Sequence, residues 1–301
     1  MARRLVTLDV FTTQPLTGNP LAVVLDGDGL EAERMQAIAR EMNLSETVFV
    51  RQGNGPGERA DIRIFTPTRE LPFAGHPTVG TAVLLALIDR NGERGHTAFG
   101  LKERIGVIPC EVEVTAEDSG RASFRLPRLP NAWGEGRSIA EAAQALGLAP
   151  HEIGFDGHRP SRHSAGVAYD LVPVASLDAL ARAKPEGEAF TQAFGGSDHP
   201  AAYVYTRQTM RSGRCFRARM FAPDMGISED PATGSAAAAF VGALMDFEGV
   251  GDGEHSVVIE QGFEMGRPSE IMLKIVVSDS VVQSAEISGG AVIVSRGELF
   301  L

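Results

Sequence analysis

The distribution of hydrophobic and polar positions separates two kinds of helical segment in this chain. Residues 31–42 carry apolar side chains at the i, i+3, i+4 and i+7 spacing of an amphipathic helix with one buried face. Residues 77–88 and 236–245 are instead apolar on nearly every face. A helix without a polar face cannot lie on a protein surface, so other elements must enclose both of these runs.

Most of the remaining chain is predicted to form strands, because it consists of short runs rich in β-branched and aromatic residues bounded by turn residues. The predicted strands are residues 5–11, 21–25, 47–50, 61–65, 97–101, 105–108, 111–115, 122–126, 165–174, 201–206, 215–221, 256–260, 271–277, 281–287, 291–295 and 297–301. Residues 138–149 and 176–183 add two peripheral helices. Since few helices are left to cover the apolar ones, strongly curved sheets must wrap around them. The predicted fold class is α+β.

Matching motifs precede the two apolar runs and indicate an internal repeat. Arg63-x-Phe-x-Pro is followed by His76-Pro-x-x-Gly-Thr-Ala, and Arg219-x-Phe-x-Pro is followed by Asp230-Pro-x-x-Gly-Ser-Ala. Two blocks in the same order favour duplication over coincidence. We therefore predict two related halves with one site between them.

Each half is predicted to place a polar motif at the start of its buried helix. The first N–H groups of a helix lack intrahelical partners and the helix dipole is positive there, so two converging helix starts could hold a carboxylate. Pro77 and Pro231 suit a first helical turn, and Gly75 permits close approach by a ligand. The alternative interpretation is that Asp230 is only an N-cap and His76 only a loop histidine.

Composition and charge narrow the function classes. A formal net charge of -11 argues against nucleic-acid binding, but not against a small anionic substrate held by backbone N–H groups. The apolar runs are shorter than the roughly 18 residues that a membrane span requires. The first residues enter a strand pattern without a signal-peptide segment, so we expect a cytoplasmic protein with no membrane partner.

Other kinds of site find little support in the sequence. The seven histidines form no His-Glu-x-x-His motif, and we expect no metal. A Gly-x-Ser-x-Gly elbow is absent, which argues against a serine hydrolase. The glycine-rich residues 53–57 lack the Lys-Ser/Thr of a phosphate loop. Cys110 and Cys215 are too few for a disulfide framework and are interpreted as buried structural thiols.

A set of longer motifs resembles one family. They are Asp9-Val-Phe, Gly18-Asn19-Pro20-Leu-Ala-Val-Val, Ala39-Arg-Glu-Met-Asn-Leu-Ser-Glu46-Thr-Val-Phe-Val, Glu70-Leu-Pro-Phe-Ala-Gly-His76-Pro, Glu229-Asp-Pro-Ala-Thr-Gly-Ser-Ala and Gln261-Gly-Phe-Glu-Met-Gly-Arg-Pro-Ser. In this order they resemble the PhzF-type phenazine-biosynthesis isomerase family along the whole chain. The resemblance implies the diaminopimelate-epimerase fold, in which two pseudo-symmetric domains each wrap a barrel-like sheet around a central apolar helix. The domains are expected at residues 1–117, joined by 286–301, and at residues 118–285.

The resemblance also implies a reaction and the residues that carry it. Glu46 would be the general acid/base, and His76 and Asp230 would complete the polar cleft. The residues expected to orient the substrate are Ser45, Gly75, Gly234 and Ser235. The expected activity is proton transfer on a small carboxylic acid, such as a dihydro-hydroxyanthranilate, by a cytoplasmic homodimer that uses neither metal nor organic cofactor. Glu46 would need a pKa nearer neutrality than a free glutamate, which burial supplies. Residues 157–165 and 207–214 are candidate specificity loops.

One departure from the relatives of this fold bears on the mechanism. Diaminopimelate epimerase uses a pair of cysteines, one from each half, whereas the matching positions here are Ala74-Gly75-His76 and Asp230. Epimerisation by two thiols is therefore disfavoured. Two alternatives stay open: an amino-acid or hydroxy-acid epimerase or racemase that uses Glu46, His76 and Asp230, and a non-catalytic small-molecule-binding protein.

Overall fold

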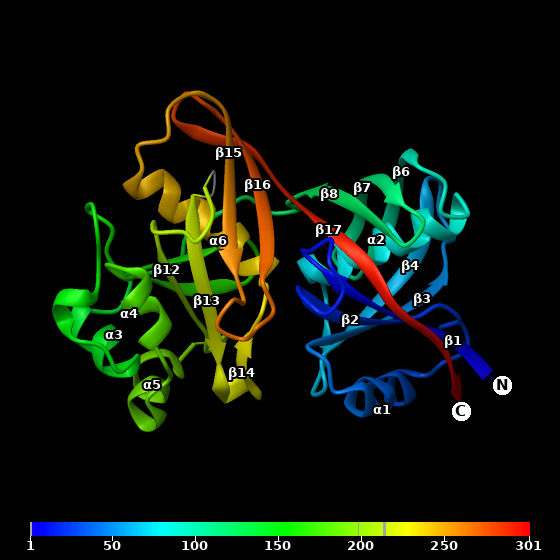
Figure 1. Cartoon of the computed structure of the whole chain (residues 1–301), viewed down its shortest axis with the longest axis horizontal. Helices are drawn as coiled ribbons and strands as arrows, with labels where there is room; N and C mark the ends of the chain where they lie inside the picture. Colours follow the sequence, from blue (N-terminus) through cyan, green and yellow to red (C-terminus); the bar gives the residue numbers. More distant parts are fainter. Residues whose placement is uncertain (1, 198, 213–214) are drawn as a thin grey trace. The chain divides into compact units, whose positions relative to one another are not determined.

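The chain divides into two compact units, which are described separately below. A computed structural model describes residues 2–197, 199–212 and 215–301, so positions 213–214 of the loop 207–214 lie outside it. The first unit comprises residues 1–125 and 288–301, and the second comprises residues 126–287 (Figure 1). The sequence suggested boundaries at 117 and 285. Strand β8 (Ser119–Arg125) lies with the first unit because it pairs with β7 (Gly106–Ala116).

A closed sheet forms the first unit. Its other strands are β1 (Ala2–Val10), β2 (Asn19–Val24), β3 (Glu46–Gln52), β4 (Glu58–Phe65), β6 (Gly95–Glu103) and the end of β17 (Val281–Phe300). Pairing proceeds in the order β1-β2-β3-β4-β6-β7-β8-β17 and returns to β1. The two ends of the chain thus lie side by side, with Ala2 opposite Phe300 (Figure 1). Closure removes the exposed edges that an open sheet would present to other chains.

Helix α2 (Gly75–Asp89) lies inside this barrel. Every residue from 75 to 87 is buried, and the helix contacts β1, β2, β3, β6, β7 and β8. Gly80 permits this packing, because a Cβ atom there would lie 2.6 Å from a Leu21 methyl and 2.7 Å from a Val10 methyl. The prediction that residues 77–88 form an enclosed helix is confirmed as far as residue 87, and Ile88 is exposed.

Helix α1 (Ala32–Met42) shows the opposite pattern. Only one face is covered, where Met35 and Ile38 pack against Phe49 and Phe65. The amphipathic helix predicted for residues 31–42 is confirmed.

The second unit repeats the scheme around α6 (Gly234–Phe247). Its strands are β9 (Asn131–Ala132), β10 (Ser161–Ser164), β11 (Ala168–Pro173), β12 (Ala202–Thr206), β13 (Phe216–Ala222), β14 (Ile227–Asp230), β15 (Gly253–Gln261), β16 (Ser269–Ser278) and the start of β17. Residues 236–244 of α6 are buried. The helix contacts β9, β10 and β11 near one end of the strand row and β16 near the other, so the sheet bends around it. The predicted α+β fold, with barrel-like sheets around apolar helices, is confirmed.

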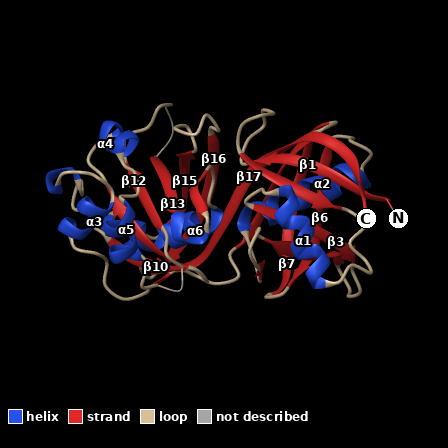
Figure 2. Ribbon diagram, turned by 90° about the horizontal axis from the view of Figure 1, so that it is seen from below, coloured by secondary structure: helices blue, strands red, loops and turns tan. Residues whose placement is uncertain are grey.

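Three short helices gather beside β12 in the second unit (Figure 2). They are α3 (Ile139–Ala145), α4 (Leu177–Arg182) and α5 (Gly187–Phe194). Helix α3 is shorter than the predicted 138–149, because Gly147 adopts a φ of 65° that ends the helical path. Helix α5 was not predicted, yet its Phe190 and Phe194 rings are fully buried.

The C-terminal residues form one strand where three were predicted. Strand β17 runs without a break from Val281 to Phe300, through Gly289 and Gly290. These glycines are required by packing, since a Cβ atom at Gly289 would lie 2.3 Å from the Phe11 ring. The prediction of separate strands at 281–287, 291–295 and 297–301 is therefore wrong.

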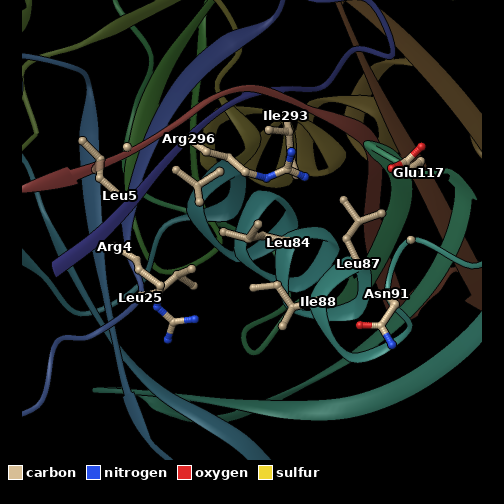
Figure 3. A pocket seen from close by; sticks show the side chains of 13 residues that line it. Arg4, Leu5, Leu25, Leu84, Leu87, Ile88, Asn91, Glu117, Ile293 and Arg296 are labelled. Atoms are coloured by element: carbon tan, nitrogen blue, oxygen red, sulfur yellow. The ribbon is translucent and has the colours of Figure 1, made fainter.

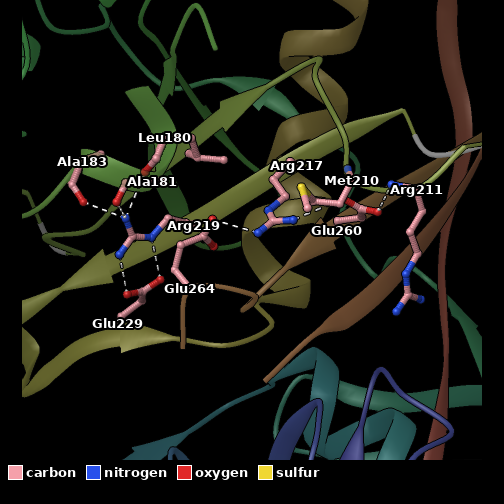
Figure 4. A network of polar contacts seen from close by, with 10 residues as sticks. All are labelled: Leu180, Ala181, Ala183, Met210, Arg211, Arg217, Arg219, Glu229, Glu260 and Glu264. Atoms are coloured by element: carbon pink, nitrogen blue, oxygen red, sulfur yellow. Dashed lines mark hydrogen bonds and ion pairs between the residues drawn. The ribbon is translucent and has the colours of Figure 1, made fainter. Parts of the chain in front are cut away.

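The repeated Arg-x-Phe-x-Pro motif has one structural role in both units. Nε and Nη2 of Arg63 each donate to one Glu70 oxygen at 2.8 Å. Arg219 makes the same two bonds to Glu229, also at 2.8 Å (Figure 4). The remaining Arg219 nitrogen, Nη1, donates to the backbone oxygens of Leu180, Ala181 and Ala183. Each of these two arginine–glutamate pairs holds the segment that leads to the buried helix. A bidentate pair of this kind fixes the relative orientation of its two side chains.

We expect Arg219→Met to destabilise the second unit by about 3–5 kcal/mol, because it leaves a largely buried carboxylate and three carbonyls unpaired. The single tryptophan, Trp133, lies in this unit and reports its unfolding by urea. The control is Arg211→Met, which removes an exposed pair with Glu270 and is expected to cost less than about 1 kcal/mol. Equal effects of the two variants would contradict the role given to Arg219.

Candidate active site

The predicted base Glu46 is placed by the junction between α1 and β3. Asn43 ends α1 in the left-handed conformation, with φ of 51°, and three residues later the chain enters β3 at Glu46. Ser45 occupies the bend between them. Pairing with Leu21 fixes the backbone of Glu46 beside β2, and its side chain is only 14% exposed. A glutamate at such a junction is usually exposed to solvent, whereas Glu46 is largely buried.

His76 lies next to Glu46 in the first turn of α2. Its Nδ1 atom is 3.4 Å from Glu46 Oε2 and 3.5 Å from the amide nitrogen of Asn19. Gly75 is the first residue of the same helix, and Ala74 at the N-cap has no side chain that could cap it. Elements β2, β3 and α2 thus bring Asn19, Glu46 and His76 together. Asn19 stands in one of the family motifs but is not among the predicted site residues; it is fully buried and starts β2.

The His76 ring is neutral at physiological pH. Burial lowers its pKa from 6.5 to about 3, and the Pro20 carbonyl, which accepts a hydrogen bond from it, opposes this shift. The contact with Glu46 is therefore a contact between a carboxyl group and an uncharged imidazole. A neutral imidazole can both accept and donate a proton, so the pair suits proton transfer.

In the second unit, Asp230 belongs to a buried polar cluster. It ends β14 and is 6% exposed, and its Oδ2 accepts a 2.5 Å hydrogen bond from Thr233 Oγ1. The Gln261 amide nitrogen donates to the Asp230 backbone oxygen at 2.8 Å and to Thr233 Oγ1 at 3.0 Å. The N-cap of α6 is Thr233, three residues after Asp230. Asp230 is therefore not the N-cap residue of α6.

Gly234 and Ser235 are the first two residues of α6. Ser235 Oγ lies 2.7 Å from the hydroxyl of Tyr169, which comes from β11. Tyr169 was not a candidate from the sequence, because an aromatic residue in a strand is usually a core residue. The structure thus forms two polar groups: Asn19, Glu46 and His76 in the first unit, and Asp230, Thr233, Ser235, Tyr169 and Gln261 in the second.

A cavity in the first unit lies away from these residues. It has a volume of about 380 Å³ and is lined by the second half of α2, including Leu84, Leu87 and Ile88, with Arg296 and Glu117 around it (Figure 3). His76 and Leu87 are about 16 Å apart along the helix axis at 1.5 Å per residue. The cavity therefore belongs to the opposite end of α2 from the candidate site.

Three further features concern metals, thiols and membranes. Within the described ranges, no three His, Cys, Asp or Glu side chains cluster in a way that could hold a metal ion. Both cysteines are free; Cys110 is buried as predicted, whereas Cys215 is only half-buried. No helix in the described part of the chain is long and apolar enough to cross a membrane.

Comparison with known proteins agrees with the fold. The family model described as "Phenazine biosynthesis-like protein" (PhzC-PhzF) matches residues 8–297. The chain is 48% identical to an uncharacterized isomerase of Mesorhizobium japonicum, over 99% of both chains. It is 36% identical to the trans-2,3-dihydro-3-hydroxyanthranilate isomerase of Pseudomonas aeruginosa, over 99% of both. A PhzF-family crystal structure from Bacillus anthracis superposes with a TM-score of 0.88 at 26% identity and covers 100% of both chains.

We expect the His76 ring to remain uncharged between about pH 5 and pH 8, because its folded pKa of about 3 lies below this range. Ring-nitrogen NMR shifts, assigned with a His76→Asn variant, should therefore stay constant. Unfolding returns the pKa to its ordinary value of 6.5, so the buried ring should also reduce stability as pH falls from 6.5 toward 3. A ring titration with a midpoint near 6.5 would contradict the neutral state.

Proposed function

Because the chain belongs to the phenazine biosynthesis-like family and is a PhzF-type isomerase, we propose that it moves a proton on a small carboxylic acid, with Glu46 as general acid/base. The observation that carries the proposal is the 3.4 Å contact between Glu46 Oε2 and His76 Nδ1 in a largely buried setting. Burial removes competing water, and the adjacent neutral imidazole gives the carboxyl group a partner in either protonation state. The relatives at 36–37% identity are named for trans-2,3-dihydro-3-hydroxyanthranilate, and we propose a substrate of this class.

The proton balance of such an isomerisation fits one carboxylate. Ionised Glu46 takes a proton from C3 of the substrate, the conjugated system shifts, and the same carboxyl group returns a proton at C1. The product has the atoms and the oxidation state of the substrate, so the proposed reaction calls for no redox cofactor. His76 contacts the Glu46 carboxyl group and would serve as its proton relay, or as its hydrogen-bond donor if the ring N–H turns from the Pro20 carbonyl to Glu46.

The polar group of the second unit is assigned to substrate binding in the same proposal. Asp230 would interact with the substrate amine or hydroxyl, and Ser235 would orient the substrate together with Gly234. Gly75 and Ser45 would contribute in the same way beside His76 and Glu46. The cytoplasmic location and the homodimer implied by the family resemblance are parts of the proposal, which cell fractionation and light scattering test.

Epimerisation by two thiols finds no support in this geometry. Cys110 lies within β7 and Cys215 lies just before β13, so neither is at a helix start. An epimerase that uses Glu46 and His76 would invert one carbon and incorporate solvent hydrogen there. The isomerase would instead move a double bond, and the same NMR experiment distinguishes the two outcomes.

Glu46→Gln should abolish turnover, because a carboxamide cannot take the proton. The measurement is proton NMR in D₂O with trans-2,3-dihydro-3-hydroxyanthranilate, which follows product formation and deuterium uptake. Glu41→Gln, the same change on the exposed side of α1, is the control and should be fully active. Turnover by a folded Glu46→Gln variant would remove Glu46 from the mechanism.

Asp230→Asn and Ser235→Ala should each reduce kcat/KM by about 1–3 kcal/mol, or roughly 5- to 150-fold, as expected for lost buried hydrogen bonds. Ser228→Ala, at an exposed position of the same β14, is the control and should have no effect. Steady-state kinetics on the substrate above measure all three. Unchanged kinetics in both test variants would take the second unit out of the site.

A further inference from the structure

The side chain of Glu103 is a buried carboxyl group that the proposed reaction does not use. Glu103 is the last residue of β6 and only 4% exposed. Its Oε1 atom lies 2.7 Å from Thr78 Oγ1, and Thr78 Oγ1 lies 2.8 Å from the Ala74 backbone oxygen. Ala74 is the N-cap of α2, and Thr78 is two residues beyond His76. Glu103 therefore contacts the turn that carries His76.

Hydrogen-bond accounting makes Glu103 a neutral acid. A threonine hydroxyl has one proton, yet Thr78 Oγ1 lies within hydrogen-bond distance of two acceptors, the Ala74 carbonyl oxygen and Glu103 Oε1. Both contacts are hydrogen bonds at the same time only if Thr78 donates to Ala74 and the Glu103 carboxyl group carries a proton that it donates to Thr78. The other oxygen, Oε2, is buried and has no hydrogen-bond partner among the described residues, which a charged carboxylate would not tolerate. Consistently, burial raises the pKa of Glu103 from 4.5 to about 8.

The second unit places a residue of the same shape at the equivalent position. Strand β6 runs parallel to β4, and β15 runs parallel to β13 in the same relation to the Arg-x-Phe-x-Pro motif. The last residue of β6 is Glu103, and the last residue of β15 is Gln261, which is fully buried. Gln261 donates to Thr233 Oγ1 and accepts from the Thr233 N–H at the start of α6. A carboxamide is a permanently neutral counterpart of a protonated carboxyl group.

We propose that Glu103 is a positioning residue that acts as a neutral hydrogen-bond donor, holds the first turn of α2, and so keeps His76 against Glu46. Its effect on turnover rests on the proposed function. The effect on α2 does not.

The inference predicts an alkaline limit on activity. Above about pH 8 Glu103 loses its proton, the bond to Thr78 loses its donor, and a charge appears in a buried site. The titratable group that faces Glu103 from β7 is the Cys110 thiol, whose pKa burial and Glu103 raise to about 12. On α2, His76 is already neutral in this range because its pKa is about 3. Neither group titrates near pH 8.

Three variants and a pH profile test the role in turnover. Glu103→Gln keeps a neutral donor, as Gln261 does, and should retain kcat within about twofold at pH 7 while losing the alkaline fall near pH 8. Glu103→Ala and Thr78→Val should lower kcat at least about tenfold with a smaller change in KM, because they disturb the geometry of His76. Glu113→Gln, an exposed change on β7, is the control. An alkaline fall in Glu103→Gln equal to that of the wild type, or a loss equal to that of Glu103→Ala, would overturn the inference.

The pH dependence of folding stability tests the inference without a substrate. The folded chain holds the Glu103 proton up to about pH 8, whereas the unfolded chain releases it near 4.5, so wild-type stability should fall as pH rises between these values. The thermal midpoint of Glu103→Gln should lack this component. If the thermal midpoints of the wild type and of Glu103→Gln changed in parallel with pH, the inference would be overturned whatever the activity. A chain that shows the difference but transforms no substrate would support Glu103 and refute the proposed function.

Discussion

A helix with no polar face must be surrounded on every side, and this requirement applies twice in the chain. In the first unit it is met by a barrel that closes through the pairing of the two chain ends, and in the second by a sheet that bends around α6. Because strands cover the sides of each helix, its ends are where polar residues accumulate. In the first unit Glu46, His76 and Asn19 meet at the start of α2, and the cavity beside Leu84 and Arg296 lies at its other end.

Equivalent side-chain interactions stabilise the starts of both buried helices, although the reactive groups there differ. Arg63–Glu70 and Arg219–Glu229 are the same bidentate pair at the same distances. At the ends of β6 and β15, Glu103 and Gln261 each bind a threonine near the first turn of the buried helix. His76 and Asp230 occupy matching positions in the motif but differ in chemistry. The framework was therefore kept in duplicate while the residues that carry chemistry diverged, which is how one fold comes to serve different reactions.

Local patterns were sufficient to predict most of the elements. The periodicity of residues 31–42 and the two apolar runs predicted α1, α2 and α6, because a helical face and an all-apolar helix are both visible in a short window. Helix α5 was missed because its eight residues, Gly187–Phe194, give too short a pattern. The break expected at Gly289 failed for a tertiary reason, since only the position of Phe11 explains that glycine. Barrel closure pairs Ala2 with Phe300, a contact that no local pattern contains.

Some residues of the candidate site could likewise be predicted from local sequence patterns. The repeat pointed to His76 and Asp230, and the family motif pointed to Glu46. Glu103 and Tyr169 have no local signal, because a strand residue that faces a helix start cannot be distinguished from any other strand residue. The neutral state of His76 follows from burial, which only the folded chain supplies.

A crystal structure of the chain soaked with 3-hydroxyanthranilate, a stable aromatic analogue of the proposed substrate, is the most direct test that substrate binds beside Glu46 and His76. We expect density for the ring within hydrogen-bonding distance of the Glu46 carboxyl group, with His76 still in contact with it. Ligand bound only in the cavity lined by Leu84, Leu87 and Arg296, with none beside Glu46, would contradict the assignment of the site.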